Sequence, residues 1–416
     1  MSIDADSLGT APGPDDTAGA SAGEGVPIPA PRRRRFTKGR VVLGVVALVL
    51  ILAVVSSFVS LPYYALTPGS AQNVGLLIKV PGSLDHNHSG SVNLVDVEET
   101  PLRAIDFLYF KLDDHATIIS SQALQGPETN AQAYIEGVLD MADAQQAAQV
   151  VALRELGYSV TVSENGDLVY EIGPGSPAAT ALSVGDVIIA VDSKPVATLT
   201  SLTDALAGRA PGSGVTLTYR PYAKGGSRQA TFKLGTWRIL GTGANATPDC
   251  VPTDVKTSLP LLGDKNGQFY VPAKGQKVSP ASCVGLLNVE QSYDISKLPF
   301  AVDLSSEGII GPSAGLAFTL GLMQKLDTAD LTGGLKVACT GTMSINGQVG
   351  EIGGIEQKTF AVRAAGAKIF LVPPGNYAEA EKYAGPSLKI YSVSSITEAL
   401  KVLESHGGKI VKPGAS

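Results

Sequence analysis

The sequence predicts a multidomain α/β (α+β) protein that begins with a single N-terminal transmembrane helix. Its 416 residues suffice for two or three domains, each with its own core. An uncharged run covers residues 41–61, and beyond it short strand-like runs alternate with segments of helical periodicity. The length of the chain, its uncharged run and the mixture of strand-like and helical periodicity together predict this fold class.

The composition excludes several classes of protein. A formal net charge of −6 offers no basic surface for nucleic acid. The chain has no G-x-x-x-x-G-K-[ST] pattern, so we expect it to carry no ATPase of its own. Its three cysteines and four histidines form neither C-x-x-C nor H-E-x-x-H, so we expect no metal site and no cofactor.

The first 61 residues predict a tail and a membrane anchor. Residues 1–40 are rich in small and polar types, which predicts a disordered tail, and its end holds six arginines and lysines. The uncharged run over 41–61 is 21 residues long, about 30 Å as a helix, which matches a bilayer core. The positive-inside rule then keeps the N-terminus in the cytoplasm and places the later domains outside.

This run has two alternative interpretations besides an anchor. A buried core helix rarely follows so many positive charges. A cleaved signal peptide has a shorter apolar core of about 7–15 residues and a small-x-small cleavage site. Here the run is longer and ends in Leu-Pro-Tyr-Tyr, and interfacial aromatics belong at such a boundary. The prediction is a single-pass protein of the cell membrane.

The region from 65 to 156 predicts strands and one helix outside the membrane. Apolar and polar residues alternate over Ser91–Val97, and helical spacing covers Met141–Leu156. No chemistry is assigned to residues 65–156.

The three cysteines have different surroundings. Cys250 and Cys283 flank a polar stretch rich in glycine and proline, and outside the cell they could form a disulfide. Two free thiols are the alternative. Cys339 lies in an apolar run and is expected to be a small core residue.

Residues 157–236 have the order of elements of a small β-rich binding module. A strand over Asp167–Ile172 leads into G-S-P-A, and L-S-V-G-D-V-I-I-A-V-D then reads as a turn and a buried strand. This order resembles a PDZ domain. The resemblance implies that an extended peptide or C-terminus binds as an added strand. The family's carboxylate-binding loop would fall near 163–166, where no Gly-Leu-Gly-Phe-like sequence occurs, so a spacer role stays open.

Ser313 lies in the most informative stretch, G-I-I-G-P-S-A-G over 308–315. A strand-like run precedes it and a helix-compatible run follows, so the serine is expected in a turn at a helix N-terminus. Gly311 and Gly315 let a substrate backbone approach closely. Free N–H groups there could stabilise an oxyanion, each worth roughly 3 kcal/mol of barrier.

A serine nucleophile needs a base, and two candidates can be compared. The G-x-S-x-G elbow of α/β-hydrolases requires a downstream histidine, and the one available is His406 in a glycine-rich tail. The other candidate is Lys358, at the start of a predicted helix with small apolar neighbours. Burial there would lower the pKa of the amine and let it act as a base. A solvated surface lysine is the ordinary alternative.

Both motifs resemble the proteolytic domain of Lon-type proteases over residues 240–405. G-P-S-A-G matches the nucleophile motif and G-G-I-E-Q-K the base motif, with Lys358 in the place of the catalytic lysine. The resemblance also implies a supporting role for Thr340, whose hydroxyl would help hold the lysine or the nucleophile. Residues 406–416 are a tail. The combination of anchor, PDZ-like domain and Lon-like domain resembles the YlbL-type family of membrane-bound bacterial proteases.

The resemblance implies an ATP-independent serine endopeptidase that cleaves unfolded or extended proteins outside the cytoplasm. Ser313 would be the nucleophile and Lys358 the general base. The expected partners are protein or peptide substrates and the membrane, and Lon-type domains often form homo-oligomeric rings. A non-catalytic membrane scaffold that binds partners through the PDZ-like domain is the alternative function.

Overall fold

The computed structural model describes residues 38–415, except for 127–128, 223–224, 241–246, 257–258, 260, 266–267, 271–272, 274, 278–280 and 296. The chain separates into two compact units, residues 1–55 and 56–416, which are described in turn. Most of the predicted tail, residues 1–37, lies outside the described residues.

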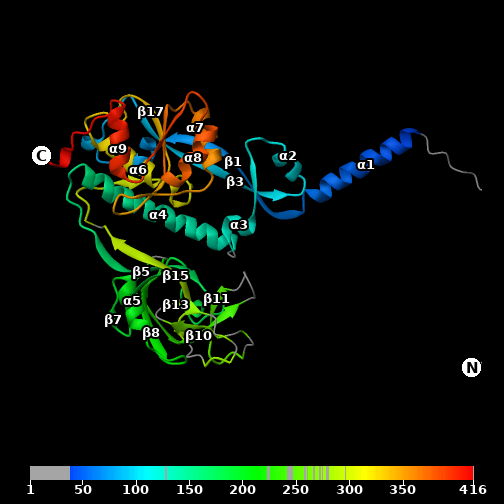
Figure 1. Cartoon of the computed structure of the whole chain (residues 1–416), viewed down its shortest axis with the longest axis vertical. Helices are drawn as coiled ribbons and strands as arrows, with labels where there is room; N and C mark the ends of the chain where they lie inside the picture. The colour runs from blue at the N-terminus through cyan, green and yellow to red at the C-terminus, as the bar shows by residue number, and fades with distance from the viewer. Residues whose placement is uncertain are drawn as a thin grey trace, which may run out of the picture. The chain divides into compact units, whose positions relative to one another are not determined.

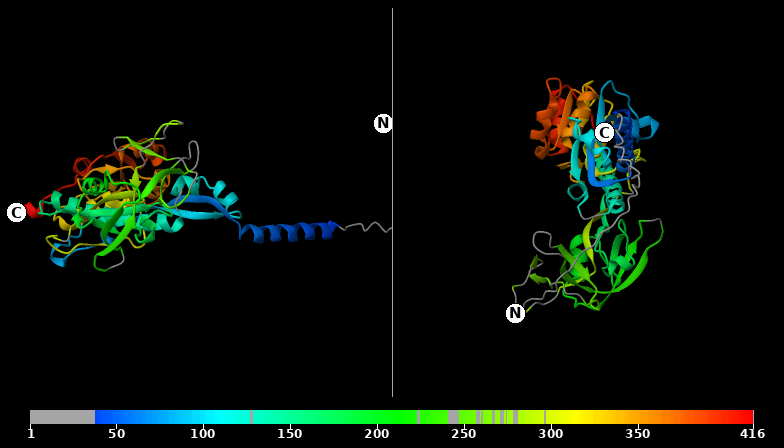
Figure 2. Two further views of the ribbon diagram at one scale, coloured as in Figure 1. Left: turned by 90° about the horizontal axis from the view of Figure 1, so that it is seen from below. Right: turned by 90° about the vertical axis from the view of Figure 1, so that its right-hand side faces the viewer.

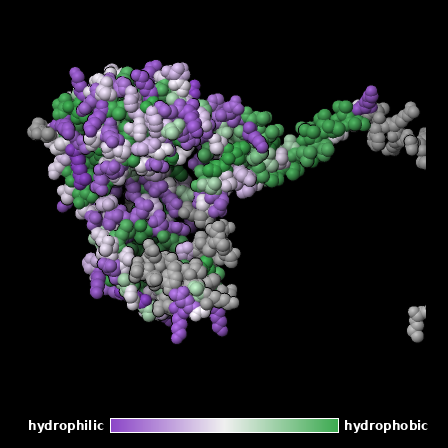
Figure 3. Space-filling view, viewed as in Figure 1, coloured by the Kyte–Doolittle hydropathy of each residue, from purple (hydrophilic) through white to green (hydrophobic). Residues whose placement is uncertain are grey.

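The first unit is dominated by helix α1 (Lys38–Ser56). Its apolar side chains are exposed, with Leu43 at 69% and Val49 at 58%, and Figure 3 shows them in green along the helix. In the part of the chain that the structure describes, no helix meets the length and apolarity needed to cross a membrane. The helix also stops short of the predicted end at 61, because Ser60 already pairs with Arg103 in a sheet.

A six-stranded sheet forms the centre of the second unit, in the order β21-β20-β17-β3-β1-β4. Strands β3, β17, β20 and β21 run parallel, whereas β1 is antiparallel to both β3 and β4. The strands are β1 (Ser60–Asn73), β3 (Ser91–Arg103), β4 (Thr117–Ser120), β17 (Lys336–Cys339), β20 (Ile369–Val372) and β21 (Lys389–Ser392).

Helices cover both faces of this sheet, because neighbouring side chains of a strand point to opposite faces. Val337 and Cys339 pack into one core with helices α4, α6 and α9, while Ala338 packs into a second core with α7 and α8. The helices are α4 (Asn130–Glu155), α6 (Gly315–Leu326), α7 (Ile355–Ala364), α8 (Pro374–Ala384) and α9 (Ile396–Ser405).

The sheet joins segments that are far apart in the sequence. Figures 1 and 2 show the blue and cyan strands β1 and β3 among the orange and red elements of the C-terminal part. This differs from the predicted partition, in which 65–156 and 240–405 are separate regions. The parallel pairing of β3 with β17 places both segments in one core.

A second sheet, in the order β15-β5-β6-β8-β9, forms the PDZ-like part with helix α5 (Leu199–Leu206). Strand β15 lies outside the predicted range 157–236, yet it pairs with β5 along its whole length. Residues 163–166, where the PDZ resemblance would put the carboxylate-binding loop, begin β5 instead. The strands are β5 (Ser163–Ile172), β6 (Val187–Val191), β7 (Lys194–Pro195), β8 (Gly214–Arg220), β9 (Arg228–Lys233) and β15 (Leu286–Asp294).

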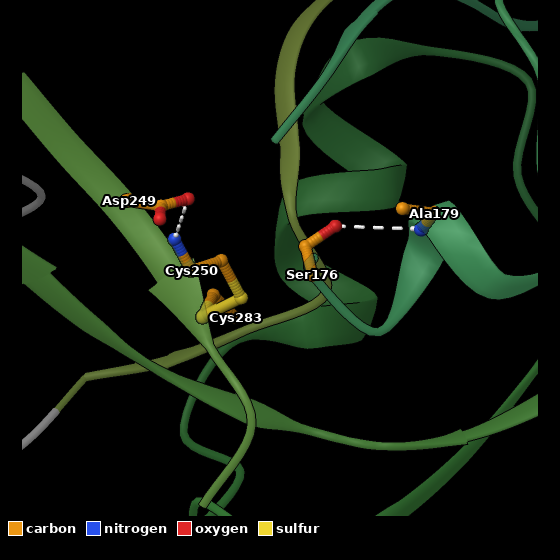
Figure 4. The surroundings of a disulfide bond; sticks show 5 residues. All are labelled: Ser176, Ala179, Asp249, Cys250 and Cys283. Atoms are coloured by element: carbon orange, nitrogen blue, oxygen red, sulfur yellow. Dashed lines mark hydrogen bonds between the residues drawn. A yellow bond between two sulfur atoms is a disulfide. The ribbon is translucent and has the colours of Figure 1, made fainter. Parts of the chain in front are cut away.

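A disulfide joins Cys250 and Cys283, the pair suggested by the sequence, with Cα atoms 5.9 Å apart (Figure 4). It links the outer strands of the small sheet β11-β10-β14. Cys339 is a free, buried core residue. The sheet consists of β10 (Gly235–Leu240), β11 (Thr247–Val251) and β14 (Ser282–Cys283), and a separate hairpin consists of β12 (Gly263–Lys265) and β13 (Gln268–Tyr270).

Short elements complete the described chain. The helical turns are η1 (Val74–Leu77), η2 (Gly82–Leu84), η3 (Ala178–Thr180), η5 (Pro312–Ala314), η6 (Pro413–Ala415), α2 (Phe107–Lys111) and α3 (Ser121–Gln125). The short strands are β2 (Ile78–Lys79), β16 (Asp303–Leu304), β18 (Thr342–Met343) and β19 (Val349–Gly350).

Candidate active site

Ser313 lies in the turn η5, which leads directly into α6. Gly311, before the turn, has a φ of 90°, a value that side chains other than glycine rarely adopt. Gly315, after it, packs so closely on β18 that an added Cβ would lie 2.7 Å from the backbone nitrogen of Met343. The two predicted supporting glycines therefore let the turn form and hold it against the core.

Lys358 reaches Ser313 from the first turn of α7. The helix begins after Gly354, which adopts the left-handed conformation. The Lys358 Nζ donates a hydrogen bond to Ser313 Oγ at 2.8 Å, and the lysine is only 3% exposed. The structure thus brings together the two residues that the sequence selected, in the geometry that a serine and its base require.

Thr340 connects this pair to the sheet. It follows β17, is fully buried, and accepts a hydrogen bond from Lys358 Nζ at 3.3 Å. Its own hydroxyl donates to the Ser313 carbonyl at 3.2 Å, and the backbone N–H of Gly341 donates to the same carbonyl at 2.9 Å. Thr340 therefore holds both partners at once.

The charge state of Lys358 is set by opposing influences. Burial lowers the pKa of its amine to about 8, because desolvation disfavours the ammonium form. The carboxylates of Asp96 and Glu99 oppose this by favouring the ammonium. Desolvation raises the pKa of Glu99, and the lysine charge opposes that shift. Around neutral pH a useful fraction of the amine is consequently available as a base.

Ser313 and Lys358 open onto a cleft of about 880 Å³. One wall comes from β1 and β3, another from α3 and α4, and a third from the loop before η5. The loop is tied to the helix, since the Gly311 N–H donates to the Gly137 carbonyl at 2.7 Å. A cleft of this volume has room for several side chains of a bound peptide.

The sequence reasoning missed most of this cleft. No chemistry was expected in residues 65–156, yet Asp96, Glu99 and the first half of α4 line it. That expectation was wrong because β3 reaches the site by pairing with β17, which lies far later in the chain. No motif marks Asp96 or Glu99, although acidic residues near the end of an otherwise apolar strand were a usable hint.

The alternative base does not approach the serine. His406 follows α9, and its Nε2 lies 2.7 Å from the hydroxyl of Tyr391. The G-x-S-x-G elbow would need this histidine at Ser313 Oγ, where the structure places Lys358 instead.

Fewer backbone N–H groups around Ser313 are free to bind an oxyanion than the sequence suggested. The N–H groups of Gly311, Gly315 and Leu316 already donate to backbone carbonyls of the folded chain. The Ala314 N–H belongs to the hydrogen bonding of the 3-10 turn η5, and Pro312 has no N–H, so the amide left in this turn is that of Ser313. An oxyanion bound here would therefore use the Ser313 N–H.

Comparison with known proteins agrees with both halves of this description. Residues 155–233 match the PDZ domain family, and residues 305–405 match the Lon protease (S16) C-terminal proteolytic domain. The chain is 36% identical over 93 residues to a Lon protease of Neorickettsia sennetsu, covering 22% of this chain and 11% of that protein. It is 34% identical over 107 residues to a Lon protease of Mycoplasmopsis agalactiae, covering 26% of this chain and 10% of that protein.

A solved PDZ domain of an SdrC-like protein from Listeria monocytogenes is 26% identical and covers 23% of this chain and 92% of its own, with a TM-score of 0.17. The chain spans about a tenth of the length of the curated relatives named above.

The C-terminal part of the chain thus matches a Lon-type proteolytic domain, and it holds Ser313 and Lys358 within hydrogen-bond distance of each other. The chain joins this Lon-type proteolytic domain to a PDZ domain, which is inserted between α4 and the nucleophile turn.

Proposed function

We propose that this protein is an ATP-independent serine endopeptidase, anchored in the membrane, that cleaves unfolded or extended proteins outside the cytoplasm. The observation that carries the proposal is the 2.8 Å hydrogen bond between the buried Lys358 Nζ and Ser313 Oγ at the floor of a large cleft. The same observation weighs against a purely non-catalytic scaffold, which would have no use for a buried lysine paired with a serine.

The proposed reaction is acyl transfer with a Ser-Lys dyad. Neutral Lys358 accepts the proton of Ser313 as its Oγ attacks the peptide carbonyl. The Ser313 N–H stabilises the oxyanion, and the lysine ammonium then returns the proton to the leaving amine. Water releases the acyl-enzyme by the same route in reverse. Thr340 keeps the lysine directed at the serine throughout.

Two features support the expected kind of substrate. The 416 residues contain no P-loop pattern, which supports a cleavage reaction that does not use ATP. The cleft admits side chains along an extended backbone rather than a folded domain. Substrates would therefore be chains that are already unfolded, extended or cut.

Membrane anchoring and an extracytoplasmic site are part of the proposal. They are supported by the arginine-rich segment before residue 41, by the uncharged run 41–61, and by the exposed apolar side chains of α1. The Cys250–Cys283 disulfide agrees with an oxidising compartment.

The PDZ domain is proposed to bind substrate chain ends. In the described sheet, β15 is the outermost strand beside β5, and α5 lies next to it. A small cavity of about 130 Å³ adjoins the start of β15, where Val284, Gly285 and Leu286 meet Leu206 of α5. An extended peptide that paired with β15 could place its last side chain there.

The proposal is tested with the full-length protein in detergent, incubated with unstructured β-casein in the absence of ATP. The wild type is expected to produce fragments, and Ser313→Ala is expected to produce none while keeping the wild-type melting temperature. Fragments formed equally by the two proteins would show that Ser313 is not the nucleophile. A requirement for ATP would contradict the proposed independence from an unfolding motor.

A further inference from the structure

The charged side chains that line the cleft are mostly negative. Five carboxylates line it, contributed by three separate segments of the chain, namely Asp96, Glu99, Glu136, Asp140 and Glu307. Lys358 is the one basic side chain among the described residues that line it, and this lysine points inward to Ser313. A peptide lying in the cleft would therefore meet a surface of negative charge.

The carboxylates come from different walls of the cleft that holds Ser313. Asp96 and Glu99 come from β3, Glu136 and Asp140 from successive turns of α4, and Glu307 from the loop six residues before Ser313. Glu136 and Asp140 are four residues apart and so share one face of the helix. Negative charge thus lies on more than one wall of the cleft into which Ser313 opens.

The surroundings of these carboxylates strengthen their effect on a ligand. Desolvation raises the pKa of both Glu99 and Asp140, and the neighbouring Asp143 raises that of Asp140 further. Like charges that are held together out of water favour a counter-cation. The salt bridges formed between described residues involve neither Asp140 nor Glu307. A cationic side chain of a substrate could supply that charge.

We propose that the cleft selects basic substrates, namely extended peptides with arginine or lysine close to the scissile bond. This inference rests on the proposed peptidase function, because the serine fixes where the scissile bond lies. Arginine suits the site best, since its planar guanidinium can pair with two carboxylate oxygens at once. Acidic segments would be excluded by repulsion from the same carboxylates.

The test uses the full-length protein and three short quenched fluorescent peptides built around one β-casein cleavage site. The peptides differ only in the two residues on each side of the scissile bond, which are arginine, glutamine or glutamate. Each partly exposed ion pair contributes a factor of about two to five, so the arginine peptide should exceed the glutamine peptide about tenfold in kcat/KM. The glutamate peptide should be the poorest.

Two variants assign the preference to the cleft. The double variant Asp140→Asn/Glu307→Gln keeps side-chain size and should reduce the arginine-to-glutamine ratio to about twofold. Glu404→Gln, on the exposed surface of α9 and away from the cleft, should keep the wild-type ratio. Raising the salt from about 0.1 to about 1 M should also shrink the ratio, because the screening length falls from about 10 to about 3 Å.

Equal kcat/KM values for the three peptides would overturn the inference while the peptidase proposal stands. An arginine-to-glutamine ratio that is unchanged in the double variant would do the same. If the wild type cuts none of the peptides and no casein, the peptidase proposal itself fails. The inference about the cleft is then decided by binding to Ser313→Ala, where equal dissociation constants for the three peptides would overturn it.

Discussion

Lys358 shows how burial and nearby carboxylates together set the charge of an amine. Burial alone would favour the uncharged form strongly, and the lysine is only 3% exposed. Asp96 and Glu99 counteract this by stabilising the ammonium, and the outcome is a pKa of about 8. A general base works best when its pKa lies near the working pH, so this balance favours catalysis under mild conditions.

The pH dependence of peptide cleavage should report this pKa. Below about pH 8 the folded protein holds Lys358 as the ammonium, so kcat/KM should rise about tenfold per pH unit and then level off. Glu99→Gln removes a charge that favours the ammonium, so the rise should move to lower pH, by up to about one pH unit.

The measurement is kcat/KM for one glutamine-flanked peptide across the neutral and alkaline pH range, with Glu404→Gln as the control that keeps the wild-type curve. An unshifted curve in Glu99→Gln would mean that the carboxylate does not act on the lysine, and a shift to higher pH would contradict the sign of the effect.

Burial of Lys358 should also be visible in stability. The unfolded chain keeps the amine protonated up to about pH 10.5 and the folded chain only to about 8, which costs about 3 kcal/mol below pH 8. Between these values the unfolded state binds more protons, so stability rises with pH, and above both values the cost is gone. Lys358→Met should therefore be inactive yet more stable at pH 7, by about 1–3 kcal/mol after the lost hydrogen bonds are counted.

Urea unfolding at neutral pH and again at about pH 10.5 measures the difference in free energy of unfolding between Lys358→Met and the wild type. Lys401→Met, on the exposed face of α9, is the matched control. The advantage of Lys358→Met should shrink at the higher pH. A variant that is less stable than the wild type at neutral pH would contradict a costly buried amine.

At the scale of elements, the turn η5 and the start of α6 position the nucleophile. The turn is fixed from two sides, by the Gly311 N–H on the Gly137 carbonyl of α4 and by the Gly341 N–H on the Ser313 carbonyl. Helix α6 itself is buried along nearly its whole length, so it gives the turn a rigid base. The serine can then be placed to within a fraction of an ångström, which proximity catalysis requires.

Close contact between α6 and β18 predicts a sensitive position at Gly315. A Cβ there would lie 2.7 Å from the backbone nitrogen of Met343, so Gly315→Ala must push α6 and β18 apart. Overpacking of this kind costs about 1–3 kcal/mol of stability. Because Ser313 is two residues away, kcat should fall at least about tenfold.

Gly82→Ala is the matched control, since nothing lies within 4 Å of the added Cβ. It should change the melting temperature and kcat little. Wild-type kcat in Gly315→Ala would mean that the contact with β18 does not position the serine.

At the scale of the whole molecule, the site exists only because distant segments share one sheet. Strand β17 pairs with β3 on one side and β20 on the other. Thr340 at its end meets Lys358 of α7, whose charge is influenced by Asp96 and Glu99 of β3. The PDZ domain is likewise completed by β15, which pairs with β5 although the two strands are far apart in the sequence. Such non-local pairing makes each half of the protein depend on the other for its fold.

The same architecture explains what could be predicted from the sequence. Ser313 and Lys358 were predicted because their neighbours form compact motifs, in which glycines mark the turns and small residues mark the buried helix. The role of Thr340 was implied by the resemblance to Lon-type proteases. The acidic residues of the cleft could not be predicted in the same way. No motif surrounds Asp96 or Asp140, and only the pairing of β3 with β17 brings Asp96 to the serine.

The central claim is that Ser313 is a nucleophile activated by Lys358, and covalent labelling tests it most directly. The full-length protein is treated with a fluorophosphonate probe at mildly alkaline pH, and the modified residue is located by mass spectrometry. We predict that Ser313 is labelled, that Ser313→Ala takes up no probe, and that Lys358→Met is labelled at least about a hundredfold more slowly. Ser405→Ala, a surface control on α9, should be labelled like the wild type. Labelling of Ser313 that is equally fast without Lys358, or labelling that persists in Ser313→Ala, would contradict the account.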